Sequence, residues 1–254
     1  MTAPVARLED RWATLRELTA ARIALGRCGA SLPTGETLAF ELAHAQARDA
    51  VLIPLDVEAL KTDLEGSGWH TLRVCSRAGS QQAYLARPDW GRRLRAEDAA
   101  ELLAEKGRYD VVFVVSDGLS ARAVQEHAAA LLAAVAPLLR DLAIAPVVIA
   151  TRARVALADE VGEALGARIA VSLIGERPGL SSPDSLGIYL TYDPKRGRND
   201  GERNCISNVR PAGLPVAEAA AQLATMIRAA LLAKLSGISL HAERQQALAE
   251  SASP

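Results

Sequence analysis

The chain has 254 residues, enough to bury a substantial core either as one large α/β domain or as a domain with an appendage. Its 29 Lys and Arg residues against 30 Asp and Glu residues give a formal net charge of -1, with no long block of one sign, which argues against nucleic acid and a membrane surface as main partners. Aromatic residues make up only 4% of the chain, so a base-stacking surface is also disfavoured.

The N-terminal part of the sequence predicts a helical segment over residues 1–65. Leu8, Trp12, Leu15 and Leu18 recur at spacings of three and four within residues 5–27, so a helix there places them on one face. That face needs cover, either from the main domain or from another chain. Two further helices are expected in SLPTGETLAFELAHAQARDAVL and in DVEALKTDLEGSG.

Strands and helices alternate from about residue 66 to residue 240. Strand-like runs are HTLRVCSR, YDVVFVVSDG, IAPVVIA, RIAVSLIG and LGIYLTYDP, and the helices expected between or after them are AEDAAELLAEKG, LSARAVQEHAAALLAAVAPLLRDL, ADEVGEALG and VAEAAAQLATMIRAALLAKL. Continuous Val and Ile runs separated by helices are typical of parallel strands covered on both faces. The predicted fold class is therefore α/β, a doubly wound, mostly parallel, Rossmann-like sheet behind a helical N-terminal segment, with a polar tail over residues 241–254.

Cysteines and histidines give no sign of a disulfide framework or a metal site. Cys28, Cys75 and Cys205 are odd in number and lack CxxC spacing, and no pair of the four histidines has metal-ligand spacing. The beginning MTAPVARLEDRW has no apolar signal core. We expect a reduced, cytoplasmic protein without a transmembrane span.

Ligands of such sheets bind beyond the carboxyl ends of the strands, where three loops are expected to gather. These loops are SDGLSA, ATRARVAL and GERPGLSS. Pro178 and Gly179 fit the central pair of a type II turn. Each loop also has a plain structural interpretation. Asp117 and Ser120 are favoured as capping groups over catalytic groups, Glu176 beside Arg177 fits a solvated surface pair equally well, and Cys205 is favoured as a small buried hydrophobe.

Common catalytic and nucleotide-binding motifs are absent from the sequence. It contains no GxGxxG, GxxxxGK[ST], HExxH or GxSxG pattern, so the usual dinucleotide, P-loop, zincin and hydrolase assignments lack support. The residues by themselves predict a ligand-binding α/β domain without a catalytic constellation.

Longer blocks resemble a known family. GERPGLSSPDSLGIYLTY, then ERNCISNVRPAGLPVAEAA and LSGISL, are similar to the C-terminal half of the small (light) chain of adenosylcobalamin-dependent ethanolamine ammonia-lyase. Upstream, ARIALGRCGASLPT, AHAQARDAV and YDVVFVVSDGLSA resemble the same family. The likeness covers nearly the whole chain, from about residue 20 to residue 240.

The resemblance implies a role in cofactor binding. In that family a large barrel chain holds ethanolamine and carries out its radical conversion to acetaldehyde and ammonia, while the small α/β chain closes over the cobalamin. It implies a hetero-oligomer with the large chain, a lyase subunit without catalytic residues of its own, and adenosylcobalamin as cofactor. By motif match the cobalamin contacts fall on Val155 in RARVAL, Glu176 in GERPGL and Cys205 in NCISN.

Two further expectations follow from the resemblance. Cobalamin proteins that replace the lower axial base with a histidine carry a DxHxxG pattern, which this sequence lacks, so base-on binding is implied. The complex is expected in the cytoplasm, either free or inside an ethanolamine-utilisation microcompartment. Two rival interpretations stay open at this point: a purely architectural subunit that touches no cofactor, and a free-standing α/β domain that binds a metabolite without a second chain.

Overall fold

A computed structural model describes residue 8 and residues 10–240, and its centre is a six-stranded sheet in the order β1-β3-β2-β4-β5-β6. The first four strands in the chain run parallel to one another, whereas β5 and β6 are antiparallel to their neighbours. The strands are β1 (Thr71–Cys75), β2 (Tyr109–Ser116), β3 (Val147–Thr151), β4 (Ala167–Gly175), β5 (Leu186–Tyr192) and β6 (Arg203–Val209). The predicted α/β class with a mostly parallel sheet is confirmed.

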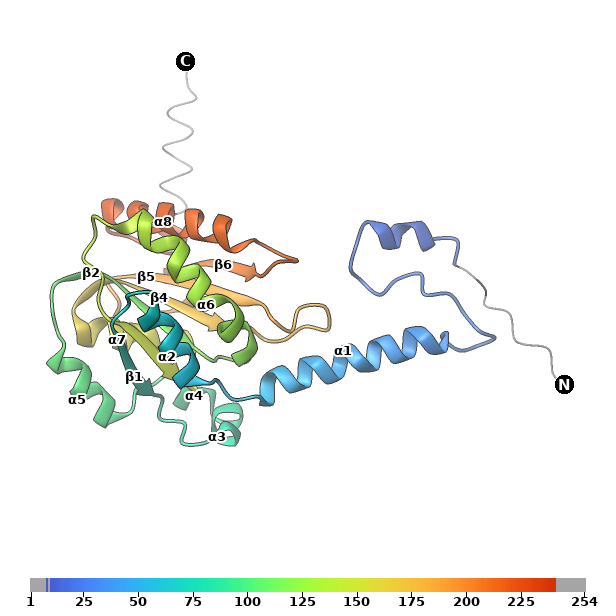
Figure 1. The fold of residues 1–254 in the computed structure, drawn as a ribbon, viewed down its shortest axis with the longest axis horizontal. Helices are drawn as coiled ribbons and strands as arrows, with labels where there is room; N and C mark the ends of the chain where they lie inside the picture. Colours follow the sequence, from blue (N-terminus) through green and yellow to red (C-terminus); the bar gives the residue numbers. More distant parts are fainter. Residues whose placement is uncertain (1–7, 9, 241–254) are drawn as a thin grey trace, which may run out of the picture.

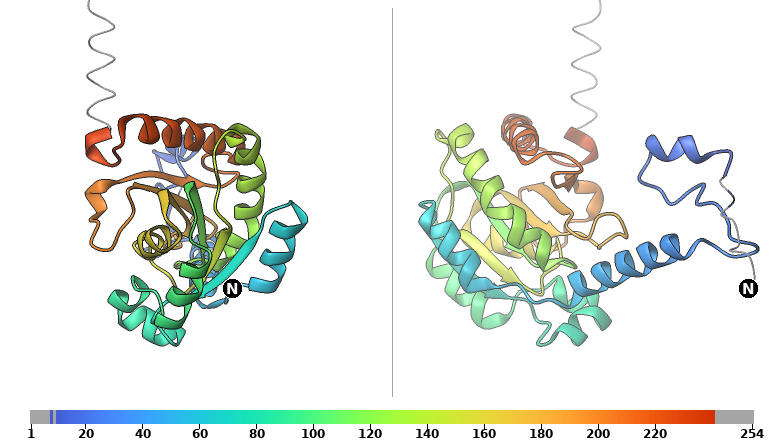
Figure 2. Two further views of the ribbon diagram at one scale, coloured as in Figure 1. Left: turned by 90° about the vertical axis from the view of Figure 1, so that its left-hand side faces the viewer. Right: turned by 45° about the vertical axis from the view of Figure 1, so that its right-hand side comes forward.

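Helices cover both faces of the sheet (Figures 1 and 2). The α-helices are α1 (Thr34–Leu52), α2 (Val57–Gly66), α3 (Gln81–Ala86), α4 (Pro88–Gly91), α5 (Ala96–Ala104), α6 (Ala121–Val135), α7 (Leu157–Leu165) and α8 (Val216–Ala233), and short 3-10 helices are η1 (Ala13–Glu17), η2 (Ala136–Leu139) and η3 (Asp200–Glu202). One apolar cluster joins α2, α6 and α8 to one face, and a second joins α5 and α7 to the other. This arrangement makes the sheet doubly wound.

The apolar runs of the strands explain why helices cover both faces of the sheet. Every residue of Val111–Val115 is buried, and alternate side chains enter the two opposite clusters. A strand that is apolar on both faces fits only between two layers of helices. The α7 helix ends at Leu165 and is followed by Gly166, whose left-handed φ of 74° suits the residue that terminates a helix before the next strand.

The α8 helix is long and apolar enough, by length and composition, to cross a membrane, and it is the only such helix among the described residues. Its buried side chains, including Leu223 and Ile227, belong to the apolar cluster that it shares with α6 and the sheet. We therefore assign α8 to the core of the α/β domain.

The N-terminal segment differs from its prediction. The expected helix over residues 5–27 is wrong for the described part, which holds only η1 and a short antiparallel bridge between Leu8 and Arg27. The α1 helix was expected, and it extends away from the domain body with the N-terminal segment at its far end (Figure 1). By contrast α2 lies within the body, because its Leu60 and Leu64 are fully buried. The predicted polar tail over residues 241–254 lies outside the described residues.

Candidate functional site

Val155 lies in the β3–α7 loop. The side chain of Asp117, in the neighbouring β2–α6 loop, holds this loop in place. One Asp117 carboxylate oxygen accepts from the backbone N–H of Arg152 at 2.8 Å, and the other accepts from Gly118 at 2.9 Å and Ala153 at 3.2 Å. Arg152 has a left-handed φ of 54°, a strained conformation that the Asp117 bonds hold in place. Burial raises the pKa of Asp117, while these three backbone donors oppose the rise.

Asp117 therefore positions a loop, which differs from both sequence interpretations of this residue. It is not the cap of α6, because that role belongs to Ser120, whose hydroxyl accepts from the backbone N–H of Ala123 at 3.3 Å. Capping by Ser120 is confirmed. With both carboxylate oxygens bonded to backbone groups, Asp117 has the contacts of a structural residue.

Glu176 follows β4 directly and is held by Ser185 at the start of β5. The Ser185 hydroxyl donates to Glu176 Oε2 at 2.7 Å, and the Glu176 backbone N–H donates to the Ser185 carbonyl at 3.0 Å. Gly187 makes room for the carboxylate, since a Cβ at this position would lie 2.7 Å from Glu176 Oε1. Glu176 is half-buried, Arg177 is exposed, and no ion pair joins these two described residues. The contacts of Glu176 thus differ from those of a solvated surface pair.

The connection after Glu176 turns at a different place from the one predicted. Gly179 and Ser182 exchange two backbone hydrogen bonds of 3.1 Å, so the turn is centred on Leu180 and Ser181. The type II turn expected at Pro178 and Gly179 is wrong, because Gly179 lacks the positive φ that such a turn requires. The segment also forms part of a hairpin, since β4 and β5 pair antiparallel.

Cys205 lies in the middle of β6, opposite Tyr189 of β5. Side chains of directly opposed residues in an antiparallel pair share one face of the sheet, so both point to the α7 side. Cys205 is exposed, and the expectation of a buried hydrophobe is wrong. Partial loss of water around the thiol raises the pKa of Cys205, and the Tyr189 hydroxyl opposes this rise. A protonated thiol is a poor nucleophile.

A buried ion pair anchors the beginning of β6 to α7. Arg203 donates to both carboxylate oxygens of Asp159 at 2.7 Å, and it also donates to the Thr191 hydroxyl at 2.8 Å. Both charged side chains are only 2% exposed. Burial alone lowers the pKa of Arg203, but the hydrogen bonds and charge of Asp159 outweigh it and raise that pKa, so Arg203 stays charged.

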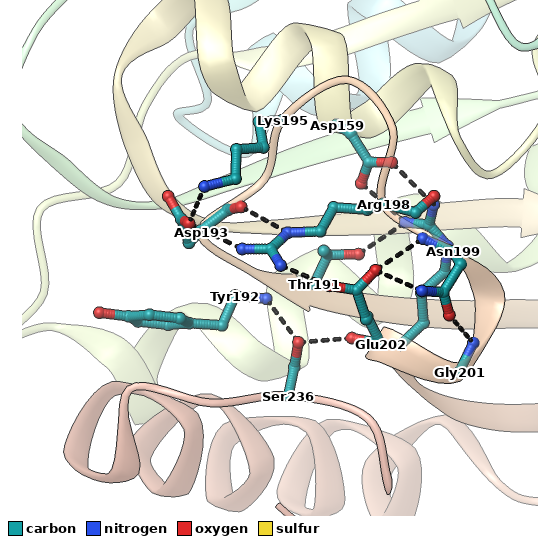
Figure 3. A network of polar contacts seen from close by, with 11 residues as sticks. Asp159, Thr191, Tyr192, Asp193, Lys195, Arg198, Asn199, Gly201, Glu202 and Ser236 are labelled. Carbon is teal, nitrogen blue, oxygen red and sulfur yellow. Dashed lines mark hydrogen bonds and ion pairs between the residues drawn. The ribbon is translucent and has the colours of Figure 1, made fainter. Parts of the chain in front are cut away.

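The loop between β5 and η3 surrounds this pair with further polar contacts (Figure 3). Arg198 donates to Asp193 at 2.7 Å and to Glu202, and the Glu202 carboxylate accepts from the backbone N–H of Asn199 at 2.8 Å. Ser236, beyond α8, bridges the backbone N–H of Tyr192 and the carbonyl of Glu202. The network fixes β6, and therefore Cys205, relative to α7 and the loop that carries Val155.

Two adjoining cavities bring the three sequence-predicted residues together. The first has a volume of about 400 Å³ and is lined by Val155 and Cys205; the second, of about 380 Å³, is lined by Val155 and Glu176. Arg154, Val155 and Tyr189 line both cavities. The site thus spans the carboxyl ends of β3 and β4 and the face of β5 and β6 that carries Tyr189 and Cys205.

A second cluster of ligand-type side chains lies elsewhere, on α6 and the β4–β5 loop. One ligand atom each of Glu126, His127 and Asp184 lies within 4.8 Å of the others. Arg122 donates to Glu126 at 2.7 Å, and Arg210 lies 3.7 Å from Asp184, so two positive charges already neutralise the carboxylates. We assign no metal site to this charge network.

Comparison with known proteins gives the family. The sequence model of the ethanolamine ammonia-lyase light chain matches residues 9–241. The chain belongs to the ethanolamine ammonia-lyase light-chain family. Its relatives include proteins named ethanolamine ammonia-lyase small subunit from Ralstonia nicotianae, 53% identical over 93% of this chain and 90% of the relative, and from Azotobacter vinelandii, 52% identical over 94% and 91%. One from Xanthomonas campestris pv. campestris is 49% identical over 98% of this chain and 93% of the relative.

Sequence reasoning missed two residues of this light-chain site. Tyr189 was seen only as part of a strand-like run, and its role as a wall of both cavities depends on β6, which periodicity did not predict. Arg154 was noted in its loop without a role. Its place in a strand-exit loop was the only available signal.

Proposed function

We propose that this chain is the small subunit of an ethanolamine ammonia-lyase and binds adenosylcobalamin together with a large catalytic subunit. One observation carries the proposal: in a chain of the light-chain family, Val155, Glu176 and Cys205 come from three separate elements and line two adjoining cavities. The second subunit completes the site, and the complex converts ethanolamine to acetaldehyde and ammonia.

The groups that line the cavities fit a corrin. Its rim carries amides that both donate and accept hydrogen bonds, and the Glu176 carboxylate can accept from an amide NH2 while it retains its bond from Ser185. Val155 and Cys205 contribute backbone groups and apolar contact. Arg154 lines both cavities, and no carboxylate among the described residues forms an ion pair with its guanidinium.

The chemistry divides between the cofactor and the two subunits. Adenosylcobalamin, when bound, supplies the radical through homolysis of its cobalt-carbon bond. The residues of this chain bind and orient: Asp117 holds the β3–α7 loop, and the Arg203–Asp159 pair holds β6. Burial also raises the pKa of Tyr189, so neither Tyr189 nor Cys205 is ionised near neutral pH. We therefore assign ethanolamine binding and turnover to the large subunit.

The N-terminal part of the chain offers a surface for that subunit. Along α1, Leu38, Phe40 and Leu42 are 59%, 45% and 61% exposed, and before it Trp12 and Leu18 are 56% and 82% exposed. The described body of the domain leaves these side chains exposed, and we expect the large subunit to cover them. An apolar arm of this kind is typical of a subunit interface.

Reconstitution tests the proposal. The purified chain, the large subunit and adenosylcobalamin are combined, and acetaldehyde formation is compared with that of each chain alone. Activity only with both chains supports the assignment. Activity of the large chain alone favours an architectural subunit instead, and tight cobalamin binding by this chain without a partner favours a free-standing binding domain. The cellular location, in the free cytoplasm or in a microcompartment, stays a prediction that fluorescent fusions test.

A further inference from the structure

Arg154 presents a guanidinium to both cavities without a protein acceptor. Its side chain lines the Val155–Cys205 cavity and the Val155–Glu176 cavity. Its Nε is buried and has no hydrogen-bond partner, and no carboxylate within the described part of the chain forms an ion pair with it. A charged donor that is partly withdrawn from water and unpaired is costly unless something else satisfies it.

The position of this guanidinium is fixed by packing. Its central carbon lies 4.3 Å from the centroid of the Tyr84 ring, a cation-π contact. Tyr84 is fully buried, and its hydroxyl donates to the Ala153 carbonyl at 3.1 Å. Gly91 lies against both side chains, because a Cβ there would lie 2.9 Å from Arg154 Cγ and 2.9 Å from Tyr84 Cε2. Arg154 is therefore held in place before any ligand arrives.

Three neighbouring arginines have hydrogen-bond acceptors in the protein, whereas Arg177, which lines the second cavity, is exposed and not held by packing. Arg203 binds Asp159, Arg198 binds Asp193, and Arg152 donates to the Ala78 carbonyl at 2.6 Å. Arg92, at the rim of the first cavity, lies 4.0 Å from Asp200 and is half exposed. Among these residues Arg154 alone combines a fixed position with the lack of a protein partner.

We propose that Arg154 binds the phosphodiester of the nucleotide tail of adenosylcobalamin, an inference that rests on the proposed function and adds a residue to it. A fixed guanidinium matches the geometry of phosphate oxygens and prefers an anion to a neutral amide. The corrin side chains are neutral amides, so the phosphodiester is the anionic group that this ligand can offer. Glu176 and Arg154 then divide the ligand, the carboxylate taking an amide donor and the guanidinium taking the phosphate.

A ligand series separates phosphate recognition from other effects. The complex of this chain with the large subunit is titrated in equilibrium dialysis with adenosylcobalamin, with adenosylcobinamide, which lacks the phosphate and base, and with adenosylcobinamide phosphate, which lacks only the base. Arg154→Met is expected to weaken the two phosphate-bearing ligands by roughly 10- to 100-fold and adenosylcobinamide by less than about twofold. Arg154→Lys restores part of the loss, and Arg228→Met, which removes an exposed arginine paired with Asp141, is the control.

The outcomes distinguish this inference from the function on which it rests. An equal loss for all three ligands, or unchanged binding in Arg154→Met, overturns the phosphate assignment while wild-type cobalamin binding still supports the function. A phosphate-selective loss in Arg92→Met in place of Arg154→Met also overturns it. Failure of the wild-type complex to bind adenosylcobalamin contradicts the proposed function itself, and the Arg154 inference falls with it.

Discussion

Replacement of Glu176 by Ala separates ligand binding from folding. The carboxylate accepts one hydrogen bond from Ser185 at 2.7 Å, and its other oxygen faces Gly187 at the wall of the second cavity. Loss of a hydrogen bond between a carboxylate and a corrin amide is expected to cost about 1.5 to 3 kcal/mol. Since about 1.4 kcal/mol corresponds to a tenfold change, the Kd for adenosylcobalamin should rise by roughly 10- to 150-fold.

The effect of the same change on folding is smaller. The only side-chain bond of Glu176 within the described residues is the one from Ser185, whose side chain is buried and loses its acceptor. An unsatisfied hydroxyl of this kind costs about 1 kcal/mol of the free energy of unfolding. Ser185→Ala is the matched control: it removes the same bond and keeps the half-buried carboxylate, so its folding loss should be no larger than that of Glu176→Ala and its rise in Kd much smaller.

The assay combines equilibrium dialysis of adenosylcobalamin on the reconstituted complex with urea unfolding of each full-length variant. Glu176→Gln keeps the shape and one acceptor, so its Kd should lie between those of the wild type and Glu176→Ala. A Kd for Glu176→Ala within twofold of the wild type refutes the assigned contact. It would return the segment to the role of a surface turn between β4 and β5.

Three other predictions concern a buried ion pair, an exposed ion pair and the lower axial base of the cobalamin. Arg203→Met should lower the free energy of unfolding in urea by about 3 to 5 kcal/mol because it leaves Asp159 buried without its partner; a loss below about 1 kcal/mol, as for an exposed pair, contradicts this. The hydrogen bond from Arg228 lowers the pKa of Asp141 from 3.8 to about 2, so the stability contributed by this pair is present above the ordinary pKa and is lost as the pH falls towards 2. NMR titration should show a return towards 3.8 in Arg228→Met, and an unchanged pKa contradicts the assigned cause. Electron spin resonance of the cob(II)alamin complex should show no splitting change on 15N-labelling of histidine, whereas a change would contradict base-on binding.

The parallel half of the fold could be predicted because burial on both faces leaves an unbroken apolar run in the sequence. Val111–Val115 and RIAVSLIG carry that signal, and each is a strand. The antiparallel edge strand β6 was missed for the opposite reason. Its buried residues Arg203, Ile206 and Val209 are separated by exposed or half-buried ones, and Arg203 is buried through an ion pair, which hydrophobic periodicity cannot detect.

The spacing of apolar residues near the N-terminus indicated side chains that need a packing partner, but it wrongly predicted a helix there. Leu15 and Leu18 recur as on a helix, yet the described chain there forms only η1. Helices of this length depend on tertiary packing for their stability, and these residues are exposed in the chain by itself. The three site residues were named through resemblance. Periodicity and turn signals in the sequence predicted the two loops that carry Val155 and Glu176. They did not predict β6, the strand that carries Cys205.

A structure of the complex of this chain, its large subunit and bound cobalamin tests the central claim most directly. The account predicts that the corrin contacts Val155, Glu176 and Cys205, with the large subunit enclosing the other side of the ligand and touching α1. Cobalamin held entirely by the large subunit, with these three residues away from it, would contradict the account and leave the chain an architectural role.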